Sequence, residues 1–170
     1  GQHYFYDSPR QLVSSGGLGT MGFELPAAIG AQMGVPESEV WAICGDAGFQ
    51  MTMQELAVCV DERIPVKIAI MNNGYLGMVR QWQELFYNEN FVSVAVTQPD
   101  FCKLAEAYGI KSLRVDMKSE VLPAIQEARA YDGPILLDFH VDQDENVWPM
   151  VPAGAALSET IEMPEKELAR

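Results

Sequence analysis

Short apolar runs alternate along the chain with longer segments in which apolar residues recur at helical spacing. The runs predict strands at residues 12–14, 40–44, 66–71, 112–115 and 135–141. The segments between them predict helices at about 26–33, 52–61, 76–87, 99–108 and 120–130. Strands that alternate with helices are typical of a mainly parallel sheet covered on both faces. We therefore predict an α/β fold with three layers (α/β/α) and about six strands.

Two polar motifs stand where predicted strands end. Gly45-Asp46-Ala47-Gly48 follows the run at 40–44, and Asn72-Asn73-Gly74 follows the run at 66–71. Crossover connections place the ends of parallel strands at the same edge of the sheet. Asp46 and Asn73 are therefore predicted to be neighbours in space, although they are far apart in the chain.

These two motifs together favour a magnesium-diphosphate site. A carboxylate and a side-chain amide supply oxygen ligands that suit Mg²⁺, which usually keeps waters and ligand phosphates as well. The small residues Gly45, Ala47 and Gly48 leave backbone N–H groups exposed at the start of the following helix, where a phosphate binds well. Either motif alone is more often an ordinary turn, because Gly, Asn and Asp dominate turns. Their pairing on two strand ends favours the site.

The two motifs resemble the thiamine diphosphate (ThDP) motif of ThDP-dependent decarboxylases and synthases. The flanking sequences are similar to the catalytic subunit of acetohydroxyacid synthase (acetolactate synthase). They include Ser15-Gly16-Gly17-Leu18-Gly19-Thr20-Met21-Gly22-Phe23, residues 25–31, residues 49–56 and Leu76-Gly77-Met78-Val79-Arg80-Gln81-Trp82-Gln83. The resemblance covers most of the chain and implies a ThDP-binding fold.

The resemblance assigns roles to individual residues. It implies that Mg²⁺ is held by Asp46, Asn73 and the backbone carbonyl of Tyr75, and that Gly45, Ala47 and Gly48 shape the diphosphate loop. It also implies contacts with the aminopyrimidine ring of ThDP for Gly19 and Met21, and positions near the cofactor for Met51 and Met78. Trp82 would form a wall of the pocket for the second 2-ketoacid, through apolar contact with its alkyl chain.

The implied reaction belongs to valine, leucine and isoleucine biosynthesis. Pyruvate is decarboxylated, and the hydroxyethyl carbanion condenses with pyruvate or 2-ketobutyrate. In the family the activating glutamate lies in an N-terminal domain supplied by a partner chain, and FAD binds a middle domain. We therefore expect no catalytic residue among these 170 residues and no turnover by this chain alone. The expected full-length assembly is a homodimer or tetramer, and a small regulatory subunit is a further candidate partner.

Two alternatives stay open at this point. One is another ThDP enzyme of the same layout, such as glyoxylate carboligase, sulfoacetaldehyde acetyltransferase or pyruvate oxidase; Trp82 favours the synthase. The other is a non-catalytic interaction domain that keeps the fold. The presence of both Asp46 and Asn73 weighs against it.

Composition sets the remaining bounds. With 48% hydrophobic residues, the chain suits one compact domain, which we place at residues 1–157, and the Glu-rich end at 158–170 is expected to be disordered. A net charge of −13 argues against nucleic acid or an anionic membrane as partner. The absence of a long apolar run and of a signal peptide predicts a cytoplasmic protein. Cys44, Cys59 and Cys102 are interpreted as small buried hydrophobes in a reducing compartment.

Two further side chains invite a functional interpretation. Glu24 stands where the family usually has glycine. It either perturbs the cofactor site or faces solvent at a helix N-terminus, where negative charge is favourable, and we favour the second. His140 is interpreted as a satisfied histidine at a strand end rather than a catalyst.

Overall fold

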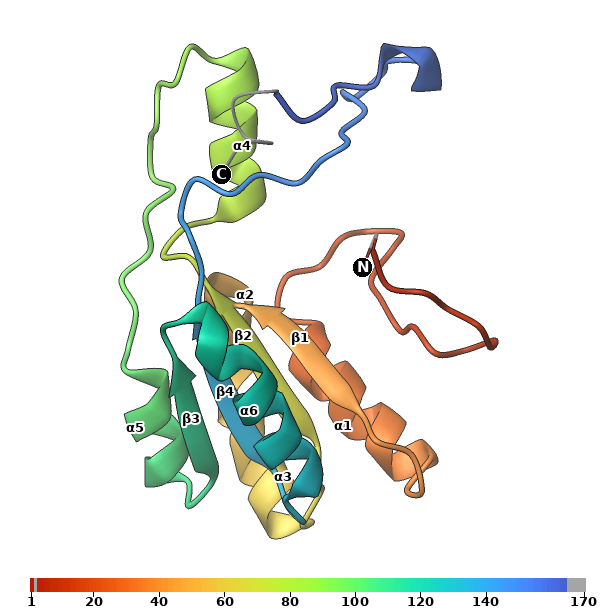
Figure 1. Cartoon of the computed structure of the whole chain (residues 1–170), viewed down its shortest axis with the longest axis vertical. Helices are drawn as coiled ribbons and strands as arrows, with labels where there is room; N and C mark the ends of the chain where they lie inside the picture. Colours follow the sequence, from red (N-terminus) through yellow and green to blue (C-terminus); the bar gives the residue numbers. More distant parts are fainter. Residues whose placement is uncertain (2, 165–170) are drawn as a thin grey trace. The chain divides into compact units, whose positions relative to one another are not determined.

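The computed structural model describes residue 1 and residues 3–164 (Figure 1). The chain divides into two compact units. The sheet unit comprises Gly1–Gly74 and Val96–Val141, and the α4 unit comprises Tyr75–Ala95 and Asp142–Arg170.

The sheet unit is built on parallel strands whose carboxyl ends lie at one edge. Within the described residues the sheet has four strands in the order β1-β2-β4-β3. They are β1 (Trp41–Gly45), β2 (Lys67–Asn72), β3 (Lys111–Val115) and β4 (Ile135–His140). The register sets Gly45 opposite Met71, and Met71 opposite Phe139. The ends of β1 and β2 are therefore adjacent, as the two polar motifs require.

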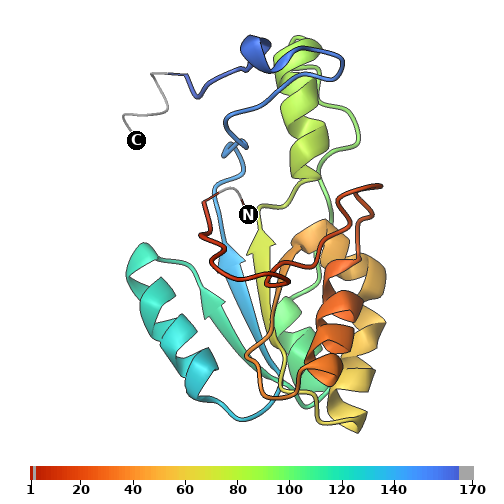
Figure 2. The same ribbon diagram turned by 90° about the vertical axis from the view of Figure 1, so that its right-hand side faces the viewer.

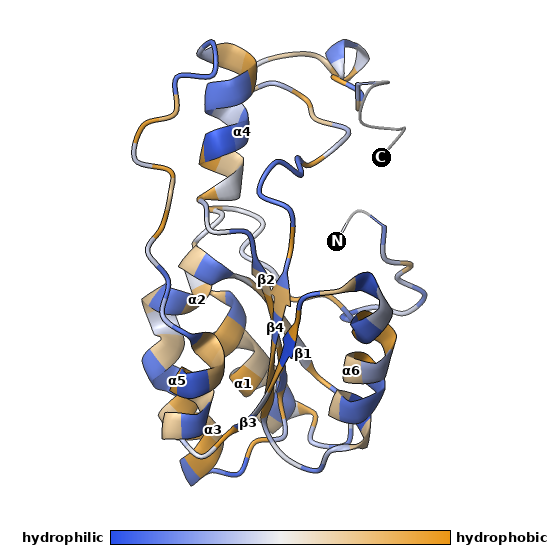
Figure 3. Cartoon of the chain, turned by 60° about the vertical axis from the view of Figure 1, so that its left-hand side comes forward, coloured by the Kyte–Doolittle hydropathy of each residue, from blue (hydrophilic) through white to orange (hydrophobic). Residues whose placement is uncertain are grey.

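Helices cover both faces of this sheet, so the predicted three-layer α/β/α fold is confirmed. Figure 3 shows α1 (Glu24–Gly34), α2 (Asp46–Thr52), α3 (Leu56–Asp61) and α5 (Phe101–Ala107) on one face and α6 (Lys118–Ala130) on the other. Figure 2 gives the same arrangement from another side, with α6 in teal across the sheet from α1 in orange.

Each helical layer has its own apolar core. On the four-helix face, β1, β2 and the helices bury one large cluster, which includes Leu25, Ile29, Phe49, Leu56, Ile68, Ile70 and Phe101. On the α6 face a smaller cluster forms around Ala124, Ala128, Ile135, Leu137 and Phe139. Strand β2 contributes to both clusters because successive side chains of a strand point to opposite faces.

Three details of the sequence-based prediction are wrong. The described sheet has four strands rather than about six, and residues 12–14 are irregular. Leu12 and Val13 are each more than half exposed, and no strand of the described sheet pairs with this short apolar run. The predicted helix at 52–61 is also divided: α2 already begins at Asp46, and a 3₁₀ turn (Met53–Glu55) separates it from α3. At Thr52 the backbone leaves helical geometry, and its hydroxyl donates to the carbonyl of Gly22 at 3.0 Å.

The α4 unit contains the helix α4 (Gly77–Phe86) and the C-terminal segment, which Gln81 holds together. The Gln81 side chain is buried, donates to the carbonyl of Val147 and accepts from its N–H, both at 2.9 Å. Near the start of the predicted tail a 3₁₀ turn spans Leu157–Glu159, and Ile161 pairs with Met150. Residues 165–170 of that tail lie outside the described residues.

None of the helices that the structure describes is both long enough and apolar enough to cross a membrane.

Two buried thiols predict a loss of stability at alkaline pH. Burial raises the pKa of Cys44 to about 12 and that of Cys59 to about 11, above the ordinary value of 9.0. Between pH 9.0 and those values the native state keeps protons that the unfolded chain releases, so the free energy of unfolding should fall as pH rises. Urea unfolding between pH 8 and about 10.5 measures this slope.

Replacing Cys44 and Cys59 by alanine should flatten that slope, whereas Cys102→Ala should change it less because Cys102 is only half-buried. An unchanged slope in the Cys44→Ala/Cys59→Ala variant would contradict the assignment.

Candidate functional site

The two polar motifs meet at the carboxyl edge of β1 and β2. Gly45 ends β1 and Asp46 begins α2, while Asn72 ends β2 and Asn73 follows it. The backbone N–H of Asn73 donates a hydrogen bond to the carboxylate of Asp46. The proximity of Asp46 and Asn73 predicted from the crossover rule is therefore present in the structure.

Asp46 is a buried carboxylate that is held by neutral donors. Only 1% of the surface of Asp46 is exposed to solvent. Burial raises the pKa of Asp46, and hydrogen bonds from the Gln98 side chain and from the backbone N–H groups of Asn73 and Ala47 act in the opposite direction. Among the described residues no lysine or arginine forms an ion pair with Asp46. The negative charge is thus oriented but not neutralised, which suits a cation.

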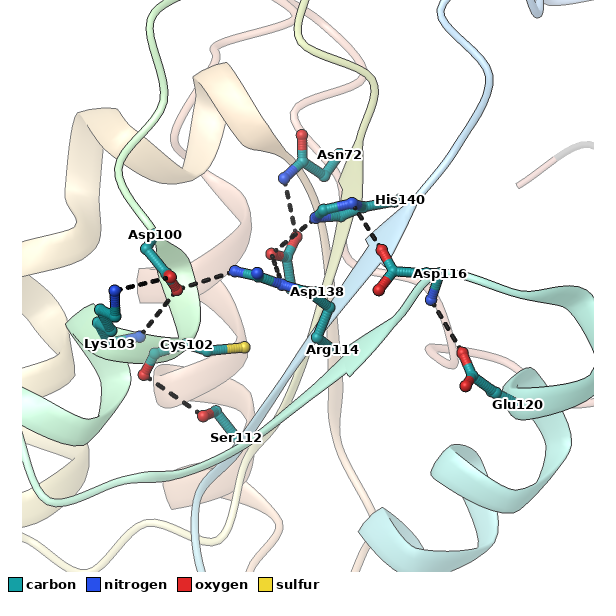
Figure 4. A network of polar contacts seen from close by, with 10 residues as sticks. All are labelled: Asn72, Asp100, Cys102, Lys103, Ser112, Arg114, Asp116, Glu120, Asp138 and His140. Carbon is teal, nitrogen blue, oxygen red and sulfur yellow. Dashed lines mark hydrogen bonds and ion pairs between the residues drawn. The ribbon is translucent and has the colours of Figure 1, made fainter.

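Asn72 and Asn73 have different roles despite being adjacent. The Asn72 side-chain amide donates to Asp138 Oδ1 at 2.9 Å, which ties β2 to β4 (Figure 4). Asp138 is buried, and a carboxylate in such a place needs hydrogen-bond partners. The Asn72 amide is therefore committed to this aspartate.

Asp138 belongs to a polar network at the ends of β3 and β4 (Figure 4). His140 Nε2 lies 3.2 Å from Asp138 Oδ2, and His140 Nδ1 lies 2.9 Å from Asp116 Oδ1. Arg114 Nε lies 3.8 Å from Asp138 Oδ2, and Arg114 Nη2 forms an ion pair with Asp100 Oδ1 at 2.9 Å. This geometry agrees with the interpretation of His140 as a satisfied histidine at a strand end.

The glycine-rich loop at 16–22 packs on α2. Gly22 has a φ of +80°, and a Cβ there would lie 3.0 Å from Met51 Cβ and 3.3 Å from the carbonyl oxygen of Gly48. Gly19 also has a positive φ, +62°, but the space around it is open. The close approach at Gly22 brings Met21 and Met51 into one neighbourhood, and both methionines are about half exposed.

The loop expected to bind diphosphate lies between β1 and α2. Apart from its chain neighbours, no described residue places an atom within 4 Å of the position that a Cβ would take on Gly45, whereas Ala47 and Gly48 are buried. A Cβ on Gly48 would meet Gly22 N at 3.5 Å and Glu24 Oε1 at 3.5 Å. The backbone at Gly45 is therefore accessible, while Gly48 serves close packing.

The favoured interpretation of Glu24 is wrong. Its carboxylate packs against Gly48 instead of facing solvent, and its Oε2 is buried with no hydrogen-bond partner among the described residues. The reason is a tertiary contact: α1 begins at Glu24 itself, and the close approach at Gly22 brings this first turn against α2.

Three of the predicted site residues belong to the α4 unit. Tyr75 forms an isolated antiparallel bridge with Ala95, and the Arg80 guanidinium lies over the Tyr75 ring at 5.6 Å. Met78 is half exposed in the first turn of α4. Trp82 is half-buried and meets Phe86 edge-on at 5.3 Å.

The residues around Asp46 fit a magnesium ion. No cluster of three or more His, Cys, Asp or Glu in the described part of the chain could hold a metal by itself. A metal at Asp46 therefore needs further oxygens from amides, carbonyls, water or phosphate, which are the ligands that Mg²⁺ accepts. Asn73, whose backbone N–H donates to Asp46, also carries a side-chain amide oxygen at this edge of the sheet.

Comparison with known proteins identifies the family. Residues 1–139 match the profile of the thiamine pyrophosphate enzyme, C-terminal TPP binding domain. The chain belongs to this family. Thiamine pyrophosphate is another name for ThDP, so the family agrees with the cofactor that the motifs at Asp46 and Asn73 indicate.

Relatives of this TPP-binding domain include named acetolactate synthases. The chain is 53% identical to the acetolactate synthase large subunit of Mycobacterium tuberculosis over 160 residues. These residues cover 91% of this chain and 26% of that protein. It is 48% identical over 167 residues to the mitochondrial catalytic subunit of Saccharomyces cerevisiae, covering 98% of this chain and 24% of that protein. The chain thus spans about a quarter of the length of these relatives.

A solved structure shares the fold. A ThDP-dependent 4-hydroxybenzoylformate decarboxylase of Rhodococcus jostii RHA1 superposes with a TM-score of 0.69 at 32% identity. The match covers 74% of this chain and 24% of that one.

Sequence reasoning missed Gln98 at this site of the TPP-binding domain. It lies outside both motifs, and its side-chain amide donates to Asp46 Oδ2. The only local signal is its position before Pro99 and Asp100, which marks a helix start rather than a site.

Gly22 and Gly19 form a matched pair for testing the packing of the glycine-rich loop. Both have positive φ, a conformation that destabilises an alanine at either position by about 1–2 kcal/mol. Gly22→Ala should lose about 1–3 kcal/mol more stability than Gly19→Ala, because its Cβ would be crowded against Met51, Thr52 and the backbone of Gly48. Chemical denaturation of both variants measures the difference in the free energy of unfolding. Equal losses would show that the close approach at Gly22 does not affect stability.

Proposed function

We propose that this chain is the ThDP- and Mg²⁺-binding domain of an acetolactate synthase. The observation that carries the proposal is the hydrogen bond from Asn73 N–H to the buried Asp46 carboxylate, at the end of two adjacent parallel strands. Membership of the TPP-binding family and 53% identity to a named acetolactate synthase support the same assignment.

The chain's own residues would anchor the cofactor. Asp46 would offer a carboxylate oxygen, Asn73 an amide oxygen and Tyr75 a backbone carbonyl to Mg²⁺. The accessible backbone at Gly45 and the start of α2 would receive the diphosphate. Gly19, Met21, Met51 and Met78 would contact the organic part of the cofactor. When bound, ThDP supplies carbanion-stabilising chemistry, which the protein orients.

The complete reaction requires more than these residues. The proposal is decarboxylation of pyruvate followed by condensation with pyruvate or 2-ketobutyrate, in branched-chain amino acid biosynthesis. The activating glutamate and an FAD site would lie elsewhere in the longer protein. Its assembly as a homodimer or tetramer, a regulatory subunit and a cytoplasmic location are parts of the same proposal.

Calorimetric titration of ThDP into the full-length protein, with and without Mg²⁺, tests the site. We expect Mg²⁺-dependent binding in the wild type and its loss in Asp46→Ala. In Asn73→Ala it should be weakened, because an oxygen ligand is removed. Binding that is indifferent to Mg²⁺, or that survives in Asp46→Ala, would refute the proposed site.

Asn72→Ala is the matched control for Asn73→Ala. It removes an identical side-chain amide one residue earlier in the chain, and the Asn72 amide donates to Asp138. The variant should lose about 1–3 kcal/mol of stability, since a buried carboxylate loses a donor, and should keep its Mg²⁺ dependence. Folding of each variant is followed by circular dichroism, so that a loss of binding is not confused with unfolding.

Trp82 tests the substrate class. Full-length protein supplied with pyruvate and 2-ketobutyrate should form both condensation products. Trp82→Ala should shift the ratio away from the longer acceptor by about 1–3 kcal/mol, or roughly 10–200-fold, because an apolar contact with its extra methylene is lost. No condensation product from the full-length protein would exclude the synthase. Acetolactate formation by the present chain alone would contradict the expectation that it lacks a catalytic residue.

A further inference from the structure

Gln98 contacts the centre of the proposed site from outside every sequence motif. Its side-chain Nε2 donates to Asp46 Oδ2. Both residues belong to the sheet unit, and Asp46 is 1% exposed. Gln98 therefore acts on a carboxylate that water reaches poorly.

The backbone before Gln98 is tied to the loop that follows β2. Val96 N–H donates to the carbonyl of Gly74 at 2.9 Å. Gly74 has a φ of +76°, and the position that its Cβ would take lies 4.0 Å from Gln98 Nε2. The amide of Gln98 is thus close to both loops of the site, the one after β1 and the one after β2.

The backbone after Gln98 is tied to α2, the helix that Asp46 begins. Asp100 caps α5 by accepting from Lys103 N–H at 3.1 Å. Phe101, which is fully buried, meets Phe49 of α2 edge-on with ring centroids 5.6 Å apart. Because Phe49 lies in the same short helix as Asp46, this contact links the segment that carries Gln98 to the helix that begins at the carboxylate.

A neutral amide is a suitable donor for a carboxylate that must also bind a cation. An ionised carboxylate has about four lone-pair sites on its two oxygens. A donor on Oδ2 restricts rotation of the group and leaves lone pairs for a metal. A lysine or arginine in the same place would also neutralise the charge and compete with the cation. Hydrogen-bond partners of metal ligands typically alter metal affinity about 10–100-fold.

We infer that Gln98 is a positioning residue for the metal ligand Asp46. It holds Oδ2 so that the carboxylate faces the cation in one orientation. The inference rests on the proposed function, because it requires that Asp46 binds Mg²⁺.

The test measures the Mg²⁺ requirement of full-length Gln98→Leu and Gln98→Met, two apolar variants of similar size. We expect the Mg²⁺ concentration for half-maximal activity to rise about 10–100-fold, with kcat at saturating Mg²⁺ close to wild type. The dissociation constant for Mn²⁺ in the presence of ThDP, measured from the spin-resonance signal of free Mn²⁺, should rise by the same factor. This second readout does not depend on turnover.

Gln11→Leu is the matched control. Gln11 Nε2 also donates to an aspartate, Asp7 Oδ1, at 2.9 Å, but this pair is exposed. Its removal should leave both the Mg²⁺ requirement and the Mn²⁺ affinity unchanged.

The outcomes separate the inference from the function on which it rests. If Asp46→Ala keeps metal-dependent ThDP binding, the proposed function fails. If Asp46→Ala loses it while both Gln98 variants keep the wild-type Mn²⁺ affinity, only the inference is overturned. A fall in kcat at saturating Mg²⁺ without a change in metal affinity would also overturn it, because that result indicates a purely structural role.

Discussion

The parallel pairing of β1 with β2 is the constraint on which the site depends. It sets Gly45 opposite Met71, so that the residues just beyond each strand, Asp46 and Asn73, come into hydrogen-bonding contact. Parallel strands present their carboxyl ends together, and the start of α2 adds its N–H groups at the same point. A shift of one residue in this register would turn every side chain of the shifted strand to the other face and break the contact.

The same sheet edge carries two buried aspartates in opposite environments. Asp138, at β4, is surrounded by the Asn72 amide, the His140 ring and the Arg114 guanidinium. Asp46, at β1, receives hydrogen bonds from backbone N–H groups and the Gln98 amide, and burial raises its pKa. The Asp138 carboxylate has cationic and amide partners within the fold, and the Asn72 amide ties it to β2. The Asp46 carboxylate is oriented by neutral donors and forms no ion pair with a lysine or arginine among the described residues, which suits the cation proposed for this site.

The sequence predicts well whatever depends on periodicity and poorly whatever depends on tertiary contact. Strands at 40–44 and 66–71 and the meeting of their ends follow from apolar runs and crossover geometry. Residues 12–14 have the same local signal but are irregular, because no strand in the described part of the chain pairs with them. The sequence does not predict the burial of the Glu24 carboxylate, because its neighbour Gly48 is distant in the chain. Gln98 was missed for the same reason: no motif surrounds it, and it reaches Asp46 only through folding.

In the sheet unit the apolar core and the candidate site share the same short helix, α2. Phe49 lies in the short helix that Asp46 begins and is also fully buried in the main apolar cluster. Its edge-on contact with Phe101 holds the start of α5 and, with it, the segment that carries Gln98. A change in packing at Phe101 would therefore move a hydrogen bond on Asp46 without touching the motif itself. The orientation of the Asp46 carboxylate therefore depends on an apolar ring contact as well as on the polar residues that the motif names.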